Sequence, residues 1–241
     1  VKIELESVAW NSLSTKLITS LKGENEPDVT HLQPFMVSSL VSQNLLLPID
    51  DLINEIEQQN NDSIYPSLRN LQLFNGRHYG IAYAVGTTGF AYRKDISDKL
   101  GIEPPTTWKS FIEFARRFSL ASTDSLKILL PGGDPFFIDQ LFAEIVANNG
   151  GVLFDPITNK PMFNSKPVIE AIQFLKDLSP YVDKGWQTQG YLDQFNRFGR
   201  GEAGIVPVTY ARASKAIENS LLENSPIKAN TEYFALMDQP I

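Results

Sequence analysis

A carboxylate and two phenyl rings stand close together in the stretch Pro131–Phe137, whose sequence is P-G-G-D-P-F-F. The preceding residues, Lys127–Leu130, predict a short buried strand, and Pro135 is suited to the first turn of a helix. Asp134 would then be the N-cap residue of that helix, and the two glycines before it would let the backbone approach another group closely. Such a group of side chains can bind a small molecule. The alternative is that Asp134 only caps the helix while both rings pack in the core.

A second candidate group follows Pro27–Leu32, which reads as a turn leading into a strand. Gln33 and Phe35 come directly after it. In open α/β sheets ligands bind beyond the ends of the strands, so both residues are candidate ligand contacts. The alternative for Phe35 is packing against the helix that follows.

The stretch Tyr79–Trp108 is the part of the sequence around which the other elements are arranged. Gly86–Gly89 interrupts two apolar runs, Ile81–Val85 and Phe90–Tyr92. Such an interruption is expected where a chain leaves one sheet and enters another. An ordinary connection between a strand and a helix is the alternative.

Periodicity and capping residues predict the remaining elements. The alternation in Val1–Glu6 is typical of a half-buried strand, and Tyr233–Met237 begins another. Asn75-Gly76 indicates a type I′ hairpin turn, with His78 on its flank as a solvated side chain. Helices are predicted over 13–21, 64–74, 95–100, 108–118, 135–147, 165–178 and 191–198.

The composition excludes several classes of function. The 241 residues are 42% hydrophobic, enough for a sizeable core in one domain or two small lobes. The net charge of −7 disfavours nucleic acid and anionic membrane surfaces as partners. The absence of Cys excludes disulfides, thiolate metal sites and a Cys nucleophile, and two separated His residues make a His-based metal site unexpected. Dinucleotide and P-loop motifs are absent, so no cofactor is predicted.

Four stretches resemble one family. The sequence Y-G-I-A-Y…F-A-Y-R-K-D-I…L-G-I-E-P-P-T-T-W within Tyr79–Trp108 is similar to the first interlobe crossing of the solute-binding proteins of ABC importers, in their maltose-binding-like, sugar-binding branch. Pro27-Asp28-Val29 resembles a strand that reaches the binding cleft of these proteins. Asp134–Phe137 matches their acid-Pro-aromatic-aromatic stretch, and Phe198–Ile205 is similar to their F-x-x-G-x-A-A-M stretch.

The resemblance implies an α/β, two-lobed periplasmic-binding-protein-like fold (type II), in which each lobe is a mixed sheet flanked by helices. Residues 1–85 would form a first lobe that is incomplete relative to the family. Residues 86–89 would cross to a second lobe, 90–232, and residues 233–241 would cross back.

The resemblance also implies which side chains meet the ligand. The acid and the aromatic residues of Asp134–Phe137 would contact a sugar, and Tyr210 lies near the position of a stacking Trp in many members. Arg212 is a further candidate, with a solvated helix position as its alternative. The candidate contacts on both sides of the crossing are Gln33, Phe35, Tyr83, Thr87, Asp134, Phe136, Phe137, Tyr210 and Arg212.

The function that the resemblance implies is that of a binding protein and not of an enzyme. The protein would capture a mono- or oligosaccharide between its lobes and deliver it to the membrane subunits of an ABC transporter. We expect a monomer in the periplasm or outside the cell, and a lipid anchor would be compatible with either place. The alternatives are a receptor of the same fold for an oxyanion, a polyamine or an amino acid, and a glycosidase, which needs two opposed carboxylates.

Overall fold

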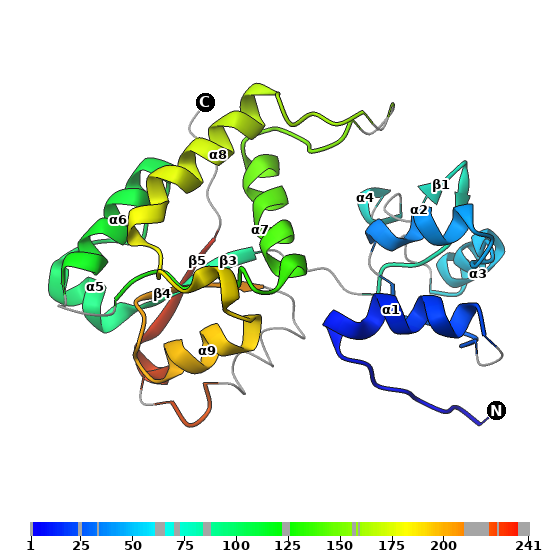
Figure 1. Cartoon of the computed structure of the whole chain (residues 1–241), viewed down its shortest axis with the longest axis horizontal. Helices are drawn as coiled ribbons and strands as arrows, with labels where there is room; N and C mark the ends of the chain where they lie inside the picture. The colour runs from blue at the N-terminus through cyan, green and yellow to red at the C-terminus, as the bar shows by residue number, and fades with distance from the viewer. Residues whose placement is uncertain are drawn as a thin grey trace. The chain divides into compact units, whose positions relative to one another are not determined.

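The computed structural model describes residues 2–23, 26–32, 34–60, 66–69, 73–83, 88–121, 126–155, 158, 160–209, 222–225 and 227–235. The chain divides into two compact units, Val1–Val85 and Gly86–Ile241 (Figure 1). None of the described helices is both long and apolar enough to cross a membrane.

The first unit is mainly helical. Its described elements are α1 (Trp10–Leu21), α2 (Pro34–Ser42), α3 (Asp50–Asn60), α4 (Pro66–Arg69) and the two-residue strands β1 (Leu73–Phe74) and β2 (Arg77–His78). Leu17 of α1 packs with Met36 and Leu40 of α2 in a small core. The predicted helix over 64–74 is wrong at Leu73–Phe74, because these two residues pair as the strand β1.

The hairpin at Asn75-Gly76 is confirmed. Both residues have positive φ, 49° and 76°, as a type I′ turn requires. His78 is not the solvated side chain that the sequence predicts, because only 14% of it is exposed. Its Nδ1 lies 2.9 Å from Oδ1 of Asp50, and the other carboxylate oxygen of Asp50 accepts a hydrogen bond from Arg77. The pair therefore fixes the hairpin to the start of α3.

Three predicted strands of the first unit are not formed among the described residues. Residues 2–9, 26–32 and 79–83 have no strand structure. Ile3, Leu5 and Val29 are 77%, 93% and 90% exposed, so the alternating pattern at the N-terminus buries no face. A strand needs a hydrogen-bonded neighbour, and no described segment pairs with these three.

The second unit contains an antiparallel sheet with the strand order β4-β3-β5. The strands are β3 (Thr88–Arg93), β4 (Ile205–Thr209) and β5 (Thr231–Ala235). Thr88 is opposite Thr209, and Gly89 is opposite Ala235. The beginning of β3 and the ends of β4 and β5 consequently meet at one edge of the sheet.

Helices surround this sheet (Figure 1). They are α5 (Lys94–Leu100), α6 (Trp108–Leu120), α7 (Pro135–Asn148), α8 (Lys166–Leu178) and α9 (Tyr191–Gly199), with short 3₁₀ turns at Ser179–Tyr181, Trp186–Thr188 and Lys228–Asn230. The helix α6 begins at Trp108, as predicted, and α7 has Asp134 at its N-cap position. The predicted strand over 127–130 contributes only single bridges, from Ile128 to Val182 and to Ile205.

An aromatic core holds the second unit together. Phe90 of β3 and Phe234 of β5 stack with ring centroids 5.4 Å apart, and Phe111 of α6 packs against both rings. Trp108 stacks on Phe174, which joins α6 to α8. Fully burying such side chains stabilises a fold by about 1.5–3 kcal/mol each.

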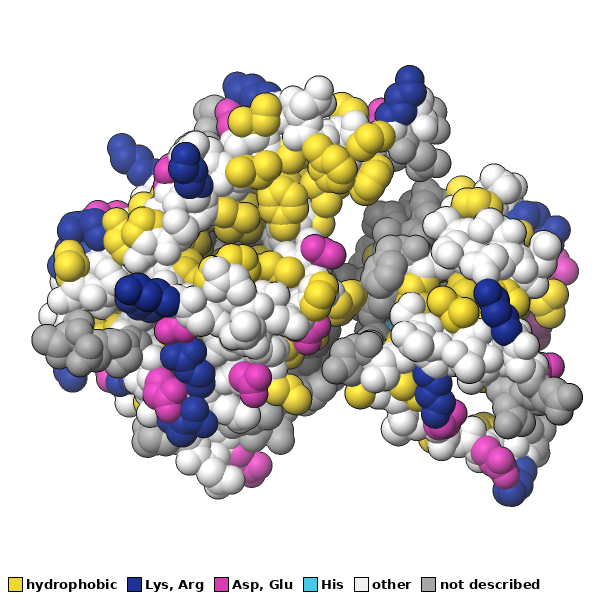
Figure 2. Space-filling model, viewed as in Figure 1, with side chains coloured by type: hydrophobic (Ala, Val, Ile, Leu, Met, Phe, Trp, Pro, Cys, Tyr) yellow, Lys and Arg dark blue, Asp and Glu magenta, His cyan; other side chains and the backbone are white. Residues whose placement is uncertain are grey.

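Apolar side chains also gather on the surface of this unit, over α7 and its connection to α8 (Figure 2). Phe154 and Phe163 of that connection are each 53% exposed and pack edge to face. Each ring therefore shields the other from solvent only in part.

Candidate functional site

Asp134 lies at the N-cap position of α7, as the sequence predicts. Its backbone carbonyl accepts hydrogen bonds from the N–H groups of Phe137 and Ile138, but its side chain makes no capping hydrogen bond. Burial raises the pKa of the half-buried Asp134 carboxyl. Asp134 therefore stands at the N-cap position without capping α7 through its side chain. Its contact with a ligand stays a prediction.

The backbone at the two glycines before Asp134 lies close to another segment of the protein. The N–H of Gly132 donates to the carbonyl of Trp186 at 2.9 Å, and the N–H of Gly133 donates to the carbonyl of Gln189 at 3.0 Å. A Cβ on Gly133 would lie 2.7 Å from the backbone of Thr188. The close approach that the sequence predicts is thus to the loop before α9, which leaves no need for a ligand to explain the glycines.

That approach brings together two aromatic rings from different helices. Phe137 of α7 and Tyr191 of α9 stack with centroids 3.8 Å apart and planes at 7°. Phe136 meets Phe137 edge to face, and Phe195 meets Tyr191 in the same way. The alternative of core packing is therefore partly right, because Phe137 packs on protein while remaining half-buried.

Tyr191 is a residue that the sequence analysis missed. It is the first residue of α9 and follows Gly190, so it lies in the first turn of its helix, as Phe136 and Phe137 do in α7. The predicted helix over 191–198 contained it, but the partner ring lies 54 positions earlier in the chain. An aromatic residue directly after a Gly at a helix start was the available signal.

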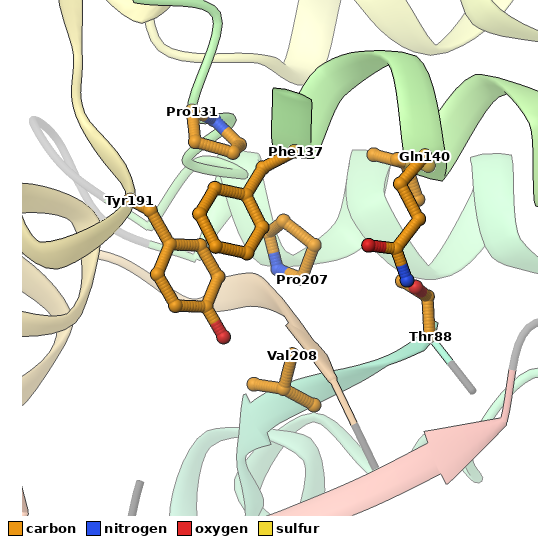
Figure 3. A pocket seen from close by; sticks show the side chains of 8 residues that line it. Thr88, Pro131, Phe137, Gln140, Tyr191, Pro207 and Val208 are labelled. Carbon is orange, nitrogen blue, oxygen red and sulfur yellow. The ribbon is translucent and has the colours of Figure 1, made fainter. Parts of the chain in front are cut away.

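The stacked pair borders a small surface hollow of about 10 Å³ at the edge of the sheet where β3 begins and β4 ends. Its lining residues are Thr88, Pro131, Phe137, Gln140, Leu141, Tyr191, Pro207 and Val208 (Figure 3). Proline, leucine and valine side chains give it an apolar floor. Thr88, Gln140 and the Tyr191 hydroxyl supply polar groups. Asp134 and Phe136 are neighbours of this site in the chain but do not line the hollow.

One carboxylate organises the wall of the hollow near β3. An oxygen of Glu144 accepts the backbone N–H of Thr88 at 2.6 Å. Its other oxygen accepts the side-chain amide of Gln140 at 2.8 Å. Glu144 thereby connects α7 to the first residue of the central strand.

Two candidate contacts of the first unit, Tyr83 and Phe35, lie among the described residues. Tyr83 is 76% exposed, and its hydroxyl lies 3.1 Å from Nδ1 of His31, whose ring it meets edge to face. Burial lowers the pKa of His31. Phe35 is the second residue of α2, so it follows the segment Pro27–Leu32 as a helix residue.

A comparison with protein families decides the identity of the chain. The family model described as "Bacterial extracellular solute-binding protein" matches residues 1–239. The chain belongs to this family. Members of the family are solute-binding proteins, and membership implies a periplasmic or extracellular location.

Curated relatives of this solute-binding protein bear the names of oligosaccharide receptors. The diacetylchitobiose binding protein DasA of Streptomyces coelicolor is 29% identical over 228 residues, which are 92% of this chain and 51% of that protein. An arabinooligosaccharide-binding protein of Halalkalibacterium halodurans is 26% identical over 184 residues, 74% of this chain and 39% of that protein. The chain thus spans about half the length, or less, of the relatives that it matches.

Solved structures confirm the α/β, type II periplasmic-binding-protein-like fold class. A sugar transporter protein of Arthrobacter chlorophenolicus, solved with bound laminaribiose, has a TM-score of 0.78 at 16% identity. The match covers 97% of this chain and 57% of that one. The resemblance to a family of solute-binding proteins is confirmed by the family model.

Four candidate contacts of this solute-binding protein lie outside the described residues. They are Gln33, Thr87, Tyr210 and Arg212. Tyr210 directly follows β4 and Thr87 directly precedes β3, so their neighbours in the chain lie at the sheet edge that bears the hollow. The shared cleft of all nine candidates stays a prediction.

Proposed function

We propose that this protein captures a mono- or oligosaccharide and delivers it to the membrane subunits of an ABC importer. The observation that carries the proposal is the stacked pair Phe137–Tyr191 beside a hollow with polar rim groups. Aromatic faces cover the apolar C–H face of a sugar ring, while hydroxyl and amide groups bind its hydroxyls. The names of the relatives support the same ligand class, because they include receptors for diacetylchitobiose and arabino-oligosaccharides.

The ligand would bind between two lobes. Gly89 is opposite Ala235, so the predicted crossings 86–89 and 233–241 each contain a residue of one neighbouring pair in the sheet of the second unit. Adjacent crossings are suited to a hinge, because small changes in a few backbone dihedrals can then move one lobe against the other. We propose residues 1–85 and 90–232 as these lobes, in a monomer that works in the periplasm or is attached outside the cell by a lipid anchor.

The alternative ligands find less support at the hollow. Its described lining contains no Lys or Arg, so an oxyanion has no cationic partner among these residues. A glycosidase needs two opposed carboxylates, and the described lining of the hollow contains no Asp or Glu. The stacked rings and the Gln140 amide carry no charge. A polyamine or an amino acid would therefore gain little binding energy there beyond cation–π contacts.

Calorimetric titration of the intact protein tests this proposal. The panel should hold mono- and oligosaccharides beside phosphate, spermidine and amino acids. We expect binding by at least one sugar and by none of the other solutes. Binding of a charged solute together with failure of every sugar would refute the carbohydrate proposal and leave the fold assignment unaffected.

A further inference from the structure

We infer that Gln140 is a specificity-determining contact of the solute site and that Glu144 is the positioning residue that fixes its amide. The inference rests on the proposed function, because it concerns the ligand of the same hollow. Neither residue belongs to the acid-Pro-aromatic-aromatic stretch, and both lie further along α7.

The geometry starts from the acceptor character of a carboxylate. Gln140 and Glu144 are four residues apart on α7, so their side chains share one face of the helix. Glu144 has no proton to donate when ionised, so only the NH₂ end of the Gln140 amide can face it. The 2.8 Å hydrogen bond from Nε2 to the carboxylate accordingly decides which way the amide is turned.

The turned amide presents its oxygen to the hollow. Gln140 lines the hollow together with Phe137 and Tyr191, and its amide oxygen points toward the middle of it (Figure 3). A hydroxyl of a ring stacked on this aromatic pair could donate to that oxygen. A ligand group that only accepts hydrogen bonds would face another acceptor there and would be repelled by its lone pairs. The site should therefore favour hydroxyl-rich ligands over ethers and esters of the same size.

Thr88 makes the arrangement rigid. The second oxygen of Glu144 accepts the N–H of Thr88, which is 8% exposed and pairs with Thr209 in the sheet. The carboxylate is therefore held by the backbone of β3 and does not have to be held by Gln140 alone. Charge-assisted hydrogen bonds of this kind are among the stronger ones in proteins.

A double-mutant cycle on the intact protein separates this role from a general structural one. Gln140→Met removes the acceptor and keeps the length of the side chain, so we expect a five- to tenfold weaker affinity, as for one lost hydrogen bond, about 1 kcal/mol. Glu144→Gln lets the Gln140 amide turn over and should weaken binding about two- to fivefold. In the Gln140→Met background the same change should have no further effect, because the two residues act as one unit.

The matched control is Glu170→Gln. Glu170 of α8 also accepts a side-chain amide, that of Asn149 at 2.9 Å, but Asn149, unlike Gln140, does not line the hollow. Its variant should bind the sugar with wild-type affinity. Titration with the best-binding sugar and with its methyl ethers gives the affinities of the wild type, the two single variants, the double variant and the control. Urea unfolding shows that each variant is folded.

Two results would overturn this inference and leave the proposed function unaffected. One is wild-type affinity in Gln140→Met, and the other is an equal effect of Glu144→Gln in both backgrounds. Wild-type protein that binds no sugar at all would overturn the proposed function and this inference with it. The two failures are therefore distinguishable within one set of titrations.

Discussion

At the scale of residues, the second unit places a pair of aromatic rings and a carboxylate near the start of α7. Phe137 and Tyr191 provide aromatic surface, and Asp134 provides a half-buried carboxylate without a capping bond. The two rings stabilise each other, so the stacked surface exists before any ligand arrives. A preformed surface lowers the entropic cost of binding.

Loss of the stacked surface should weaken sugar binding. A ring contact of about 60 Å² is worth roughly 1.5 kcal/mol at about 25 cal/mol per Å², so Tyr191→Ala should weaken the affinity about tenfold. Leu192→Ala is the control, because Leu192 is the next residue of α9 and is 56% exposed. Titration calorimetry measures both. Equal affinities of the two variants would contradict the role given to Tyr191.

Asp134 should make the protein less stable as the pH rises. Its pKa in the folded state is raised above the usual 3.8, so the folded state binds this proton more tightly than the unfolded state does. The stabilising contribution is complete below pH 3.8 and is lost as the pH rises through the raised value. Asp134→Asn should therefore gain stability relative to wild type between about pH 3 and pH 7, in urea unfolding. A difference that does not change with pH would contradict this assignment.

At the scale of elements, local residues made the end of α5 and the start of α6 predictable. Gly101 ends α5 with φ of 59°, and Thr107 caps α6 in a reciprocal arrangement with Ser110. These are local interactions, so the sequence carries them within a few positions. The stack of Phe137 on Tyr191 joins distant positions and could not be read from spacing. The strand predicted at Val1–Glu6 failed because a strand depends on a partner, which local alternation does not supply.

The cap of α6 offers a test at this scale. The Thr107 hydroxyl oxygen accepts the N–H of Ser110 at 3.1 Å. Thr107→Ala should lower the free energy of unfolding by about 1 kcal/mol. Thr106→Ala is the matched control, because that neighbouring side chain is exposed. Urea unfolding that gives the same stability for both variants would contradict the importance of this cap.

At the scale of the whole molecule, the two units differ in the size of their buried apolar cores. The second unit has a three-stranded sheet and an aromatic core around Phe111 and Phe234. The described core of the first unit centres on Leu17, Met36 and Leu40, and its described strands are two residues long. A unit with fewer buried contacts opens locally at a lower free energy.

Hydrogen exchange should therefore differ between the units in a chain limited to residues 1–241. Amides of α1 and α2 should exchange faster than amides of α6 and β3. Mass spectrometry of peptides from the two units, at one pH and temperature, measures this difference. Equal protection of both sets would contradict the expected weakness of the first unit.

The central claim is that a carbohydrate binds beside the stacked pair of the second unit. A crystal structure of the intact protein with its best-binding sugar tests it most directly. The account predicts a sugar ring against Tyr191 or Phe137, with a hydroxyl within hydrogen-bonding distance of the Gln140 amide oxygen. A sugar bound elsewhere, with the hollow lined by Gln140 and Tyr191 left without it, would contradict the account.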